Sequence, residues 1–177
     1  MIIGLCGYAQ SGKDTAAAHL VESLGWARVA FADPLREMLY ALNPALDEWT
    51  NVQSLVDKVG WEFAKKDPEV RRLLQALGTE AGRKVLGDEI WVDVAAKKIR
   101  KMLPANVVLT DVRFENEAQM ILGMYGQIIR VERPGVGAVN GHVSENGIPD
   151  WYVSEVIVNG GGIGDLRAKI ARSASPF

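Results

Sequence analysis

The most constraining feature of this sequence is the loop that joins its first two predicted elements. Ile2–Cys6 is apolar and rich in β-branched residues, as in a buried strand, and Lys13–Leu24 carries apolar residues at helical spacing. Between them runs Gly7-Tyr8-Ala9-Gln10-Ser11-Gly12-Lys13-Asp14-Thr15, which has the spacing of a phosphate-binding loop. A glycine-rich turn that only begins a helix explains neither the lysine nor its position.

Each part of this loop suits a chain of phosphates. Glycines let successive backbone N–H groups point inward, the helix N-terminus adds partial positive charge, and the Lys13 ammonium reaches the β- and γ-phosphates. The residue after the lysine is Asp14, where a Ser or Thr hydroxyl is the usual Mg²⁺ ligand. We therefore expect the Thr15 hydroxyl to bind a phosphate, and we expect magnesium to be held by the nucleotide and by water.

The rest of the chain alternates short apolar segments with longer amphipathic ones, which favours an α/β fold. The further predicted strands are Arg28–Phe31, Val107–Thr110, Ile128–Val131 and Val156–Val158. All are apolar enough to be buried on both faces of a parallel sheet. The prediction is a three-layer α/β/α domain of the P-loop NTPase class with a mainly parallel five-stranded sheet, and 177 residues fit a single domain.

Two long segments interrupt this alternation. Residues from about 35 to 102 have helical periodicity, broken mainly by prolines and glycines, and they predict a helical insertion in the sheet. The glycine- and proline-rich stretch from about 133 to 150, which includes His142, predicts a lid-like loop. Further helices are predicted around Glu115–Met124 and from about 164 to 172, and Gly25 is expected to end the first helix.

Composition excludes several classes of protein. The chain has 20 Lys and Arg against 22 Asp and Glu, so its formal charge of −2 does not attract it as a whole to nucleic acid or to an anionic membrane. Cys6 is the only cysteine, which rules out an internal disulfide and multi-cysteine metal sites. The sequence shows neither a signal-like N-terminus nor a long apolar stretch, so we expect a cytoplasmic protein without membrane contact.

Polar residues follow the second predicted strand, at the edge where open α/β sheets bind ligands. Pro34 suits the first turn of the next helix, and Asp33 either caps that helix or serves the site. Arg36 lies about one turn into this helix. It either faces the crevice and binds a phosphate or lies exposed on the surface. The residues alone leave both alternatives open.

A second polar group follows the third predicted strand. Asp111 and Arg113 are two residues apart and share a face, so the carboxylate can orient a hydroxyl or a magnesium-bound water while the guanidinium binds a phosphate. The structural alternatives are a salt bridge that closes the strand end and a helical ion pair between Arg113 and Glu117. Elsewhere, Arg71 and Arg72 point about 100° apart on one helix, so one is expected to face solvent and the other is a candidate phosphate clamp.

Taken in order, these motifs resemble those of the bacteriophage deoxynucleoside monophosphate kinases. The resemblance covers most of the chain and rests on the segments Gly12-Lys13-Asp14-Thr15, Asp33-Pro34-Leu35-Arg36, Arg71–Thr79, Trp91-Val92, Asp111-Val112-Arg113, Val131-Glu132-Arg133-Pro134-Gly135 and His142–Pro149. It implies an enzyme that transfers the γ-phosphoryl group of ATP to a deoxynucleoside monophosphate with Mg²⁺ present, supplying phage DNA precursors in the host cytoplasm. The helical insertion is shorter than in larger members, and Ala9 stands at a loop position that can be basic in the family, so base preference and the details of ATP contact do not transfer.

Carried onto this sequence, the resemblance implies three groups of residues. The positions that match ATP-binding residues are Gly7, Ser11, Gly12, Lys13, Asp14, Thr15 and Arg133. The positions that match monophosphate-binding residues are Leu35, Arg36, Arg72, Gly78, Thr79, Trp91, Asp111, Arg113 and Glu117. The residues expected around the transferring phosphoryl group are Lys13, Arg72, Asp111 and Arg113, with magnesium bound through water to Thr15 or Asp111. The implied partners are small nucleotides and a second copy of the chain, with no stable nucleic-acid complex and no membrane.

Two other functions remain as alternatives at this point. One is a P-loop kinase for a different small acceptor, such as dephospho-coenzyme A, which uses a similar sheet and helical insertion. The other is a nucleotide-binding switch or adaptor, although the sequence lacks an obvious Gln or Thr switch signature. The acceptor requirement of ADP release separates all three.

Overall fold

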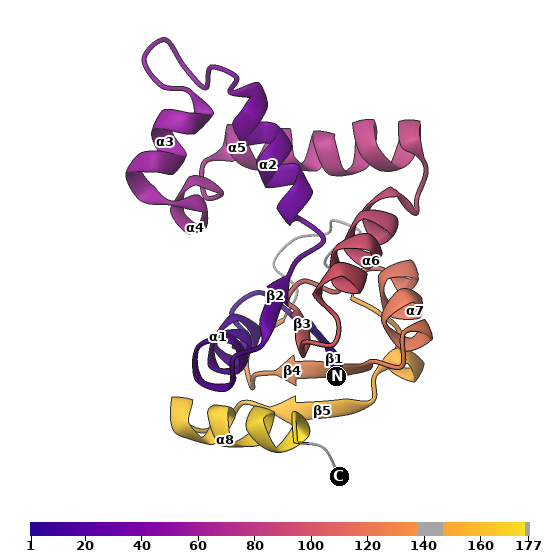
Figure 1. The fold of residues 1–177 in the computed structure, drawn as a ribbon. Coiled ribbons are helices and arrows are strands. Elements are labelled where there is room, and N and C mark those ends of the chain that lie inside the picture. The colour runs from indigo at the N-terminus through magenta and orange to yellow at the C-terminus, as the bar shows by residue number, and fades with distance from the viewer. Residues whose placement is uncertain (138–146, 176–177) are drawn as a thin grey trace. The chain divides into compact units, whose positions relative to one another are not determined.

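The computed structural model describes residues 1–137 and 147–175 (Figure 1). The chain divides into two compact units, which we call the sheet unit, residues 1–31 and 95–177, and the helical unit, residues 32–94. Residues 138–146, in the middle of the predicted lid-like loop, lie outside the described residues, and so does His142.

A parallel five-stranded sheet forms the centre of the sheet unit. Its strands are β1 (Ile2–Cys6), β2 (Ala27–Val29), β3 (Val107–Leu109), β4 (Gln127–Glu132) and β5 (Glu155–Val158). They are ordered β2-β3-β1-β4-β5, and every pair of neighbours is parallel. This arrangement confirms the predicted α/β fold, and it puts the loops after β1, β3 and β4 at one edge of the sheet.

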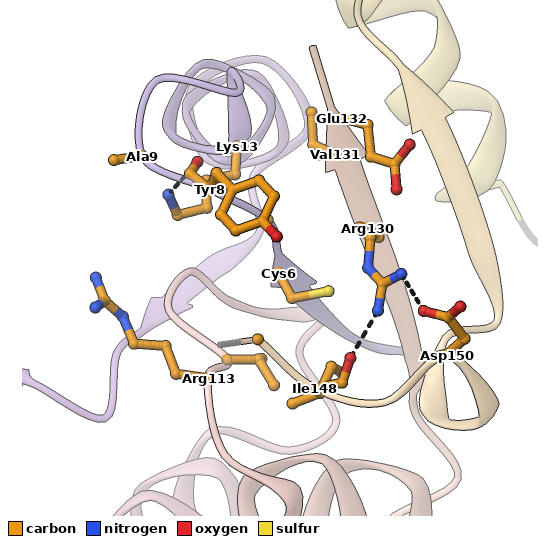
Figure 2. A pocket seen from close by; sticks show the side chains of 13 residues that line it. Cys6, Tyr8, Ala9, Lys13, Arg113, Arg130, Val131, Glu132, Ile148 and Asp150 are labelled. Atoms are coloured by element: carbon orange, nitrogen blue, oxygen red, sulfur yellow. Dashed lines mark hydrogen bonds and ion pairs between the residues drawn. The ribbon is translucent and has the colours of Figure 1, made fainter. Parts of the chain in front are cut away.

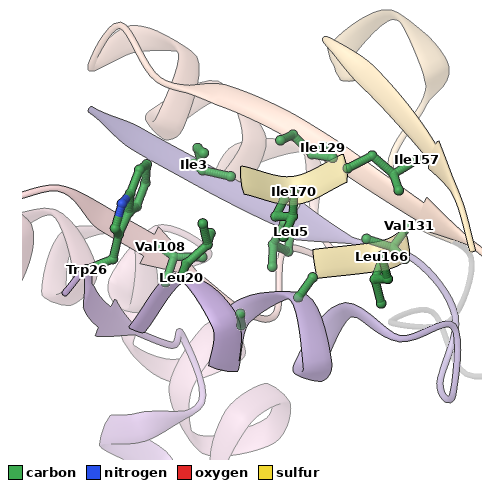
Figure 3. Packing of buried hydrophobic residues seen from close by; sticks show 12 residues of the cluster. Ile3, Leu5, Leu20, Trp26, Val108, Ile129, Val131, Ile157, Leu166 and Ile170 are labelled. Carbon is green, nitrogen blue, oxygen red and sulfur yellow. The ribbon is translucent and has the colours of Figure 1, made fainter. Parts of the chain in front are cut away.

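Helices cover both faces of this sheet. On one face, α1 (Lys13–Leu24) and α8 (Ile163–Ser173) pack Leu20, Leu166 and Ile170 against the strands (Figure 3). On the other face, α7 (Glu115–Gly123) places Ile121 so close to Gly4 that a Cβ there would lie 2.7 Å from its Cδ1 atom. A short 3₁₀ helix, η3 (Asp150–Tyr152), precedes β5.

The prediction that all strands are buried on both faces is wrong for the sheet edges. In β5 only Ile157 is buried, while Glu155, Val156 and Val158 are exposed. In β2, Arg28 is exposed as well. The reason is position, because an edge strand has a neighbour on one side only. The three central strands are fully or mostly buried.

The helical unit has its own core. Its elements are α2 (Asp33–Leu42), α3 (Val52–Val59), α4 (Trp61–Ala64), α5 (Pro68–Gln75), the π-helix η1 (Ala76–Leu86) and the start of α6 (Ile90–Met102). The buried side chains of this core are Leu39, Val52, Val56, Ala64 and Val70. In all of residues 32–94, which the structure describes throughout, the only β-structure is an isolated bridge between Ala45 and Asn51.

Capping residues explain where these helices start. Asn51 accepts a hydrogen bond from the backbone N–H of Ser54 at 2.9 Å, and Asp67 accepts bonds from Glu69 and Val70. Asp33 is not the cap that the sequence allowed, because α2 is preceded by Ala32 and has no side-chain cap. Asp33 instead lies in the first turn, where a negative charge suits the helix dipole. Among the described residues, none of the helices combines the length and the apolar character needed to cross a bilayer.

Candidate active site

The loop after β1 requires glycine at two positions. Gly7 has φ +132° and Gly12 has φ +106°, a region that residues with a Cβ rarely adopt. A Cβ on Gly7 would lie 2.3 Å from the carbonyl oxygen of Val131, and one on Gly12 would lie 2.4 Å from Nδ2 of Asn159. The two glycines therefore give the loop its curl and let it pack against β4 and the residue that follows β5.

Asn159 holds this loop in place, a role that the sequence did not reveal. Its Nδ2 donates a hydrogen bond of 2.8 Å to the carbonyl oxygen of Ser11, and both residues are buried. The Oγ atom of Ser11 is also buried and has no hydrogen-bond partner among the described residues. An unpaired buried hydroxyl is costly, and a nucleotide phosphate is one group that would satisfy it. The loop thus fits a bound phosphate chain.

Lys13 lies at the start of α1 and its ammonium group turns back over the loop. Its Nζ atom donates to the carbonyl oxygen of Tyr8 at 3.2 Å (Figure 2). Asp14 is exposed and Thr15 is partly buried in the same first turn. Within the described residues, no three His, Cys, Asp or Glu side chains are grouped as a metal would require.

A pocket beside this loop brings two of the predicted catalytic residues together. Lys13 reaches it from α1 and Arg113 from the segment after β3 (Figure 2). Its full lining is Cys6, Gly7, Tyr8, Ala9, Lys13, Val112, Arg113, Arg130, Val131, Glu132, Gly147, Ile148 and Asp150. The sequence did not single out Arg130 or Asp150, because neither matches a motif, whereas Ile148 lies in the segment His142–Pro149 that carries the family resemblance.

Cys6 and Arg130 are neighbours on the floor of this pocket. They are paired across β1 and β4, so their side chains leave the sheet on the same face. Burial raises the pKa of the Cys6 thiol, and the Arg130 guanidinium opposes part of that increase. The thiol thus stays protonated near neutral pH, as expected of a buried packing group.

Asp111 and Glu117 hold the polypeptide around Arg113. An oxygen of Asp111 accepts a hydrogen bond of 2.9 Å from the backbone N–H of Phe31. This bond ties the segment that follows β3 to the segment that follows β2. The buried Glu117 carboxylate accepts the backbone N–H groups of Arg113 at 2.8 Å and Phe114 at 3.1 Å. Glu117 is the third residue of α7 and binds the backbone N–H of the residue that precedes the helix, so it fixes the path of the backbone beside the pocket.

Four predicted acceptor-site residues lie together in the helical unit. The Trp91 indole N–H donates to the carbonyl oxygen of Gly78 at 2.8 Å, and a Cβ on Gly78 would lie 3.1 Å from Leu35. Thr79 follows Gly78 in the π-helix η1. Trp91 is buried, and its ring occupies the space where Gly82 lacks a side chain, since a Cβ there would lie 2.3 Å from the ring. Trp91 thus packs on the π-helix η1.

Two arginines of the helical unit, Arg36 and Arg72, have carboxylate partners. Arg72 binds Glu69 through Nε at 2.8 Å and Nη2 at 2.6 Å, and its guanidinium lowers the pKa of Glu69. Arg71 and Arg72 are both exposed, whereas the sequence suggested that only one would face solvent. Arg36 is 3.9 Å from Glu62 and is only 22% exposed. Arg133, the remaining ATP-binding candidate, is exposed in the sheet unit just after β4.

Comparison with known proteins decides the family. Residues 48–170 match the model of the family described as deoxynucleotide monophosphate kinase. The chain belongs to the deoxynucleotide monophosphate kinase family. A relative from Acanthamoeba polyphaga mimivirus that carries the same family name is 32% identical over 163 residues, 82% of this chain and 80% of that protein.

The phage relatives of this deoxynucleotide monophosphate kinase are longer. The deoxynucleoside-5′-monophosphate kinase of Escherichia phage T5 is 33% identical over 108 residues, 56% of this chain and 43% of that enzyme. The chain thus spans less than half of that phage relative. Among solved structures, shikimate kinase from Aquifex aeolicus has a TM-score of 0.49 and 13% identity, covering 98% of this chain and 96% of that one.

Membership in this family confirms the resemblance that the sequence motifs indicated. The chain is a kinase, an ATP-dependent phosphotransferase that acts on deoxynucleoside monophosphates, and this reading is favoured over another small-acceptor kinase and over a nucleotide switch. Its substrates are small nucleotides.

Proposed function

We propose that the loop Gly7–Thr15 binds the phosphates of ATP and that the pocket lined by Lys13 and Arg113 is where the γ-phosphoryl group passes to a deoxynucleoside monophosphate. The observation that carries the proposal is the convergence of these two cations on one pocket beside a loop with two obligatory glycines. In the reaction, an oxygen of the acceptor's 5′-phosphate attacks the γ-phosphorus. The bond from that phosphorus to the β-phosphate oxygen breaks, and ADP leaves.

The protein's contribution is to position the reactants and to neutralise charge. Lys13 and the inward backbone N–H groups hold the β- and γ-phosphates, and the Ser11 hydroxyl contributes a further hydrogen bond. Arg113, fixed through its backbone by Glu117, binds the transferring group or the acceptor phosphate. Asp111 holds the neighbouring backbone and reaches the acceptor hydroxyls or a metal-bound water.

The magnesium that accompanies ATP supplies charge neutralisation at the β- and γ-phosphates. Thr15 and Asp111 are the residues of this chain that would hold it through water. Asp14 is exposed in the first turn of α1, where its negative charge interacts favourably with the positive end of the helix dipole.

We assign the acceptor to the helical unit, through Leu35, Arg36, Arg72, Gly78 and Thr79. Leu35 and Gly78 are in contact, and Trp91 secures the same segment, which supports a common role for them. Arg36 and Arg72 each have a carboxylate partner, so a bound phosphate would exchange with Glu62 or Glu69. The product serves DNA precursor supply in a host cytoplasm, and a homodimer remains a prediction for size-exclusion chromatography with light scattering.

The test is ADP release from the purified chain with Mg-ATP and a panel of acceptors. The panel contains each deoxynucleoside monophosphate, the matching ribonucleotides and dephospho-coenzyme A. We expect strong stimulation by one or more deoxynucleotides and little by dephospho-coenzyme A. A flat response across the panel would contradict the proposal and favour a nucleotide switch.

A further inference from the structure

Arg130 is a charged residue of the pocket that has no role in the mechanism above. Arg130 lies in β4, on the sheet face that also carries Ile128 two residues earlier. Its side chain is 20% exposed, so most of it is buried beside Cys6. A buried arginine in a central strand is expensive unless its donors are paired, so its partners indicate what it is for.

Both partners come from the short segment 148–150, which lines the pocket and leads into η3. Arg130 Nη2 donates to the carbonyl oxygen of Ile148 at 2.7 Å, and Nη1 forms an ion pair with Asp150 (Figure 2). The Asp150 side chain is 90% exposed, so this ion pair by itself contributes little to stability. Its value is geometric, because a planar guanidinium fixes two oxygens that belong to residues two positions apart.

The residue held in this way forms part of the pocket wall. Ile148 is buried and lines the pocket with Val112, across from Tyr8 and Lys13. An apolar wall beside a phosphoryl group keeps water from competing with the acceptor. If the wall moves, water gains access to the same γ-phosphorus.

We propose that Arg130 is a positioning residue that holds Ile148 and Asp150 in place, and so favours phosphoryl transfer to the nucleotide over transfer to water. This inference rests on the proposed function. In the competing reaction, a water oxygen attacks the γ-phosphorus, the bond to the β-phosphate oxygen breaks, and the products are ADP, inorganic phosphate and a proton released to solvent. Arg130 touches neither substrate in this account.

The test measures two products at once, inorganic phosphate and deoxynucleoside diphosphate, and takes their ratio. Arg130→Met keeps an unbranched apolar side chain and loses both contacts, Arg130→Lys keeps the positive charge, and Arg167→Met is the matched control on the exposed side of α8. We expect Arg130→Met to raise the ratio of hydrolysis to transfer about tenfold, Arg130→Lys to restore part of it, and Arg167→Met to leave it unchanged. Amide hydrogen exchange of residues 148–152 is expected to rise in Arg130→Met alone.

The outcomes separate this inference from the proposed function. A wild-type chain that forms no deoxynucleoside diphosphate overturns both. Normal transfer by the wild type, with an unchanged ratio in Arg130→Met or an equal rise in Arg167→Met, overturns the inference alone. If Arg130→Met does not fold, Asp150→Ala replaces it, since that carboxylate is exposed, and an unchanged ratio in Asp150→Ala contradicts the proposal.

Discussion

At the scale of single residues, the phosphate-binding loop depends on glycines at positions where a side chain does not fit. Gly12 combines a positive φ with a close approach to Asn159. Gly25, at the other end of α1, has φ +71°, but the space that a Cβ would occupy there is open. The same substitution therefore tests two different things at the two ends of one helix. One position shapes the phosphate-binding loop, and the other only ends the helix.

We predict that Gly12→Ala abolishes ATP binding, because the new Cβ displaces Asn159 and the loop opens. Gly25→Ala is the control, and it is expected to cost about 1 kcal/mol of stability through backbone strain while ATP binding stays normal. Calorimetric titration with a non-hydrolysable ATP analogue measures the first effect, and thermal unfolding measures the second. Equal ATP affinity in the two variants would contradict the assigned role of Gly12.

The buried thiol of Cys6 makes a pH-dependent prediction. Burial raises its pKa in the folded chain, so the folded state retains the thiol proton to higher pH than the unfolded state. We expect slow alkylation at neutral pH that accelerates only above the ordinary thiol pKa, and fast alkylation once denaturant unfolds the chain. Rapid alkylation of the native protein at pH 7 would show that the thiol is accessible and ionised.

The sequence revealed the site residues that lie in motifs, but not those that act through contacts between distant parts of the chain. Lys13 and Arg113 were predicted from their motifs, and the structure brings both to one pocket. Arg130 and Asn159 were not predicted. The role of Arg130 depends on the pairing of β4 with β1, and that of Asn159 on a hydrogen bond to Ser11, 148 residues away in the chain. Such long-range contacts leave no local pattern in a single sequence.

At the scale of elements, local signals placed the first helix and first strand correctly. The bounds of α1 and β1 match the prediction because a continuous apolar run and a helical stretch are each followed directly by a glycine. The π-helix η1 was not predicted, since residues 76–86 have the same composition as an α-helix. It is stabilised by a tertiary contact, the Trp91 ring against Gly82. Short π-helical turns are often found at functional sites.

We predict that Trp91→Phe raises the KM for the deoxynucleoside monophosphate several-fold and leaves the KM for ATP unchanged. Phenylalanine keeps an aromatic ring at this position but has no indole N–H. The hydrogen bond to the Gly78 carbonyl oxygen is therefore lost, and the π-helix around Thr79 is held less firmly. Gly82→Ala is expected to act in the same direction, because its Cβ collides with the ring. Trp49→Phe is the matched control, since Trp49 is 90% exposed. An unchanged acceptor KM in both Trp91→Phe and Gly82→Ala would contradict this role.

At the scale of the whole molecule, the described residues place one hydrophobic core in the sheet unit and another in the helical unit. One lies in the sheet unit around Leu20 and the other in the helical unit around Leu39, and both leucines are fully buried. The alternation of strands and helices in the sequence predicted the first core. The second was visible only as a long helical stretch, because periodicity shows that helices are amphipathic but not which faces meet.

Separate cores predict separate functional losses. Leu39→Ala is expected to cost about 2–5 kcal/mol and to weaken binding of the monophosphate while ATP analogue affinity stays near normal. Leu20→Ala, with a similar cost, is expected to weaken ATP binding, because α1 carries Lys13. Titration of each variant with each ligand, below its unfolding temperature, measures both affinities. Equal loss of both ligands in Leu39→Ala would mean that the two cores do not act independently.

The central claim is that this chain moves a phosphoryl group from ATP to a deoxynucleoside monophosphate at the pocket of Lys13 and Arg113. Phosphorus NMR of a reaction with Mg-ATP and the best acceptor, run beside the Lys13→Ala variant, tests it most directly. We predict one deoxynucleoside diphosphate for each ADP in the wild type, and a rate lower by roughly three orders of magnitude in Lys13→Ala. Inorganic phosphate in place of the diphosphate, or a normal rate in Lys13→Ala, would contradict the claim.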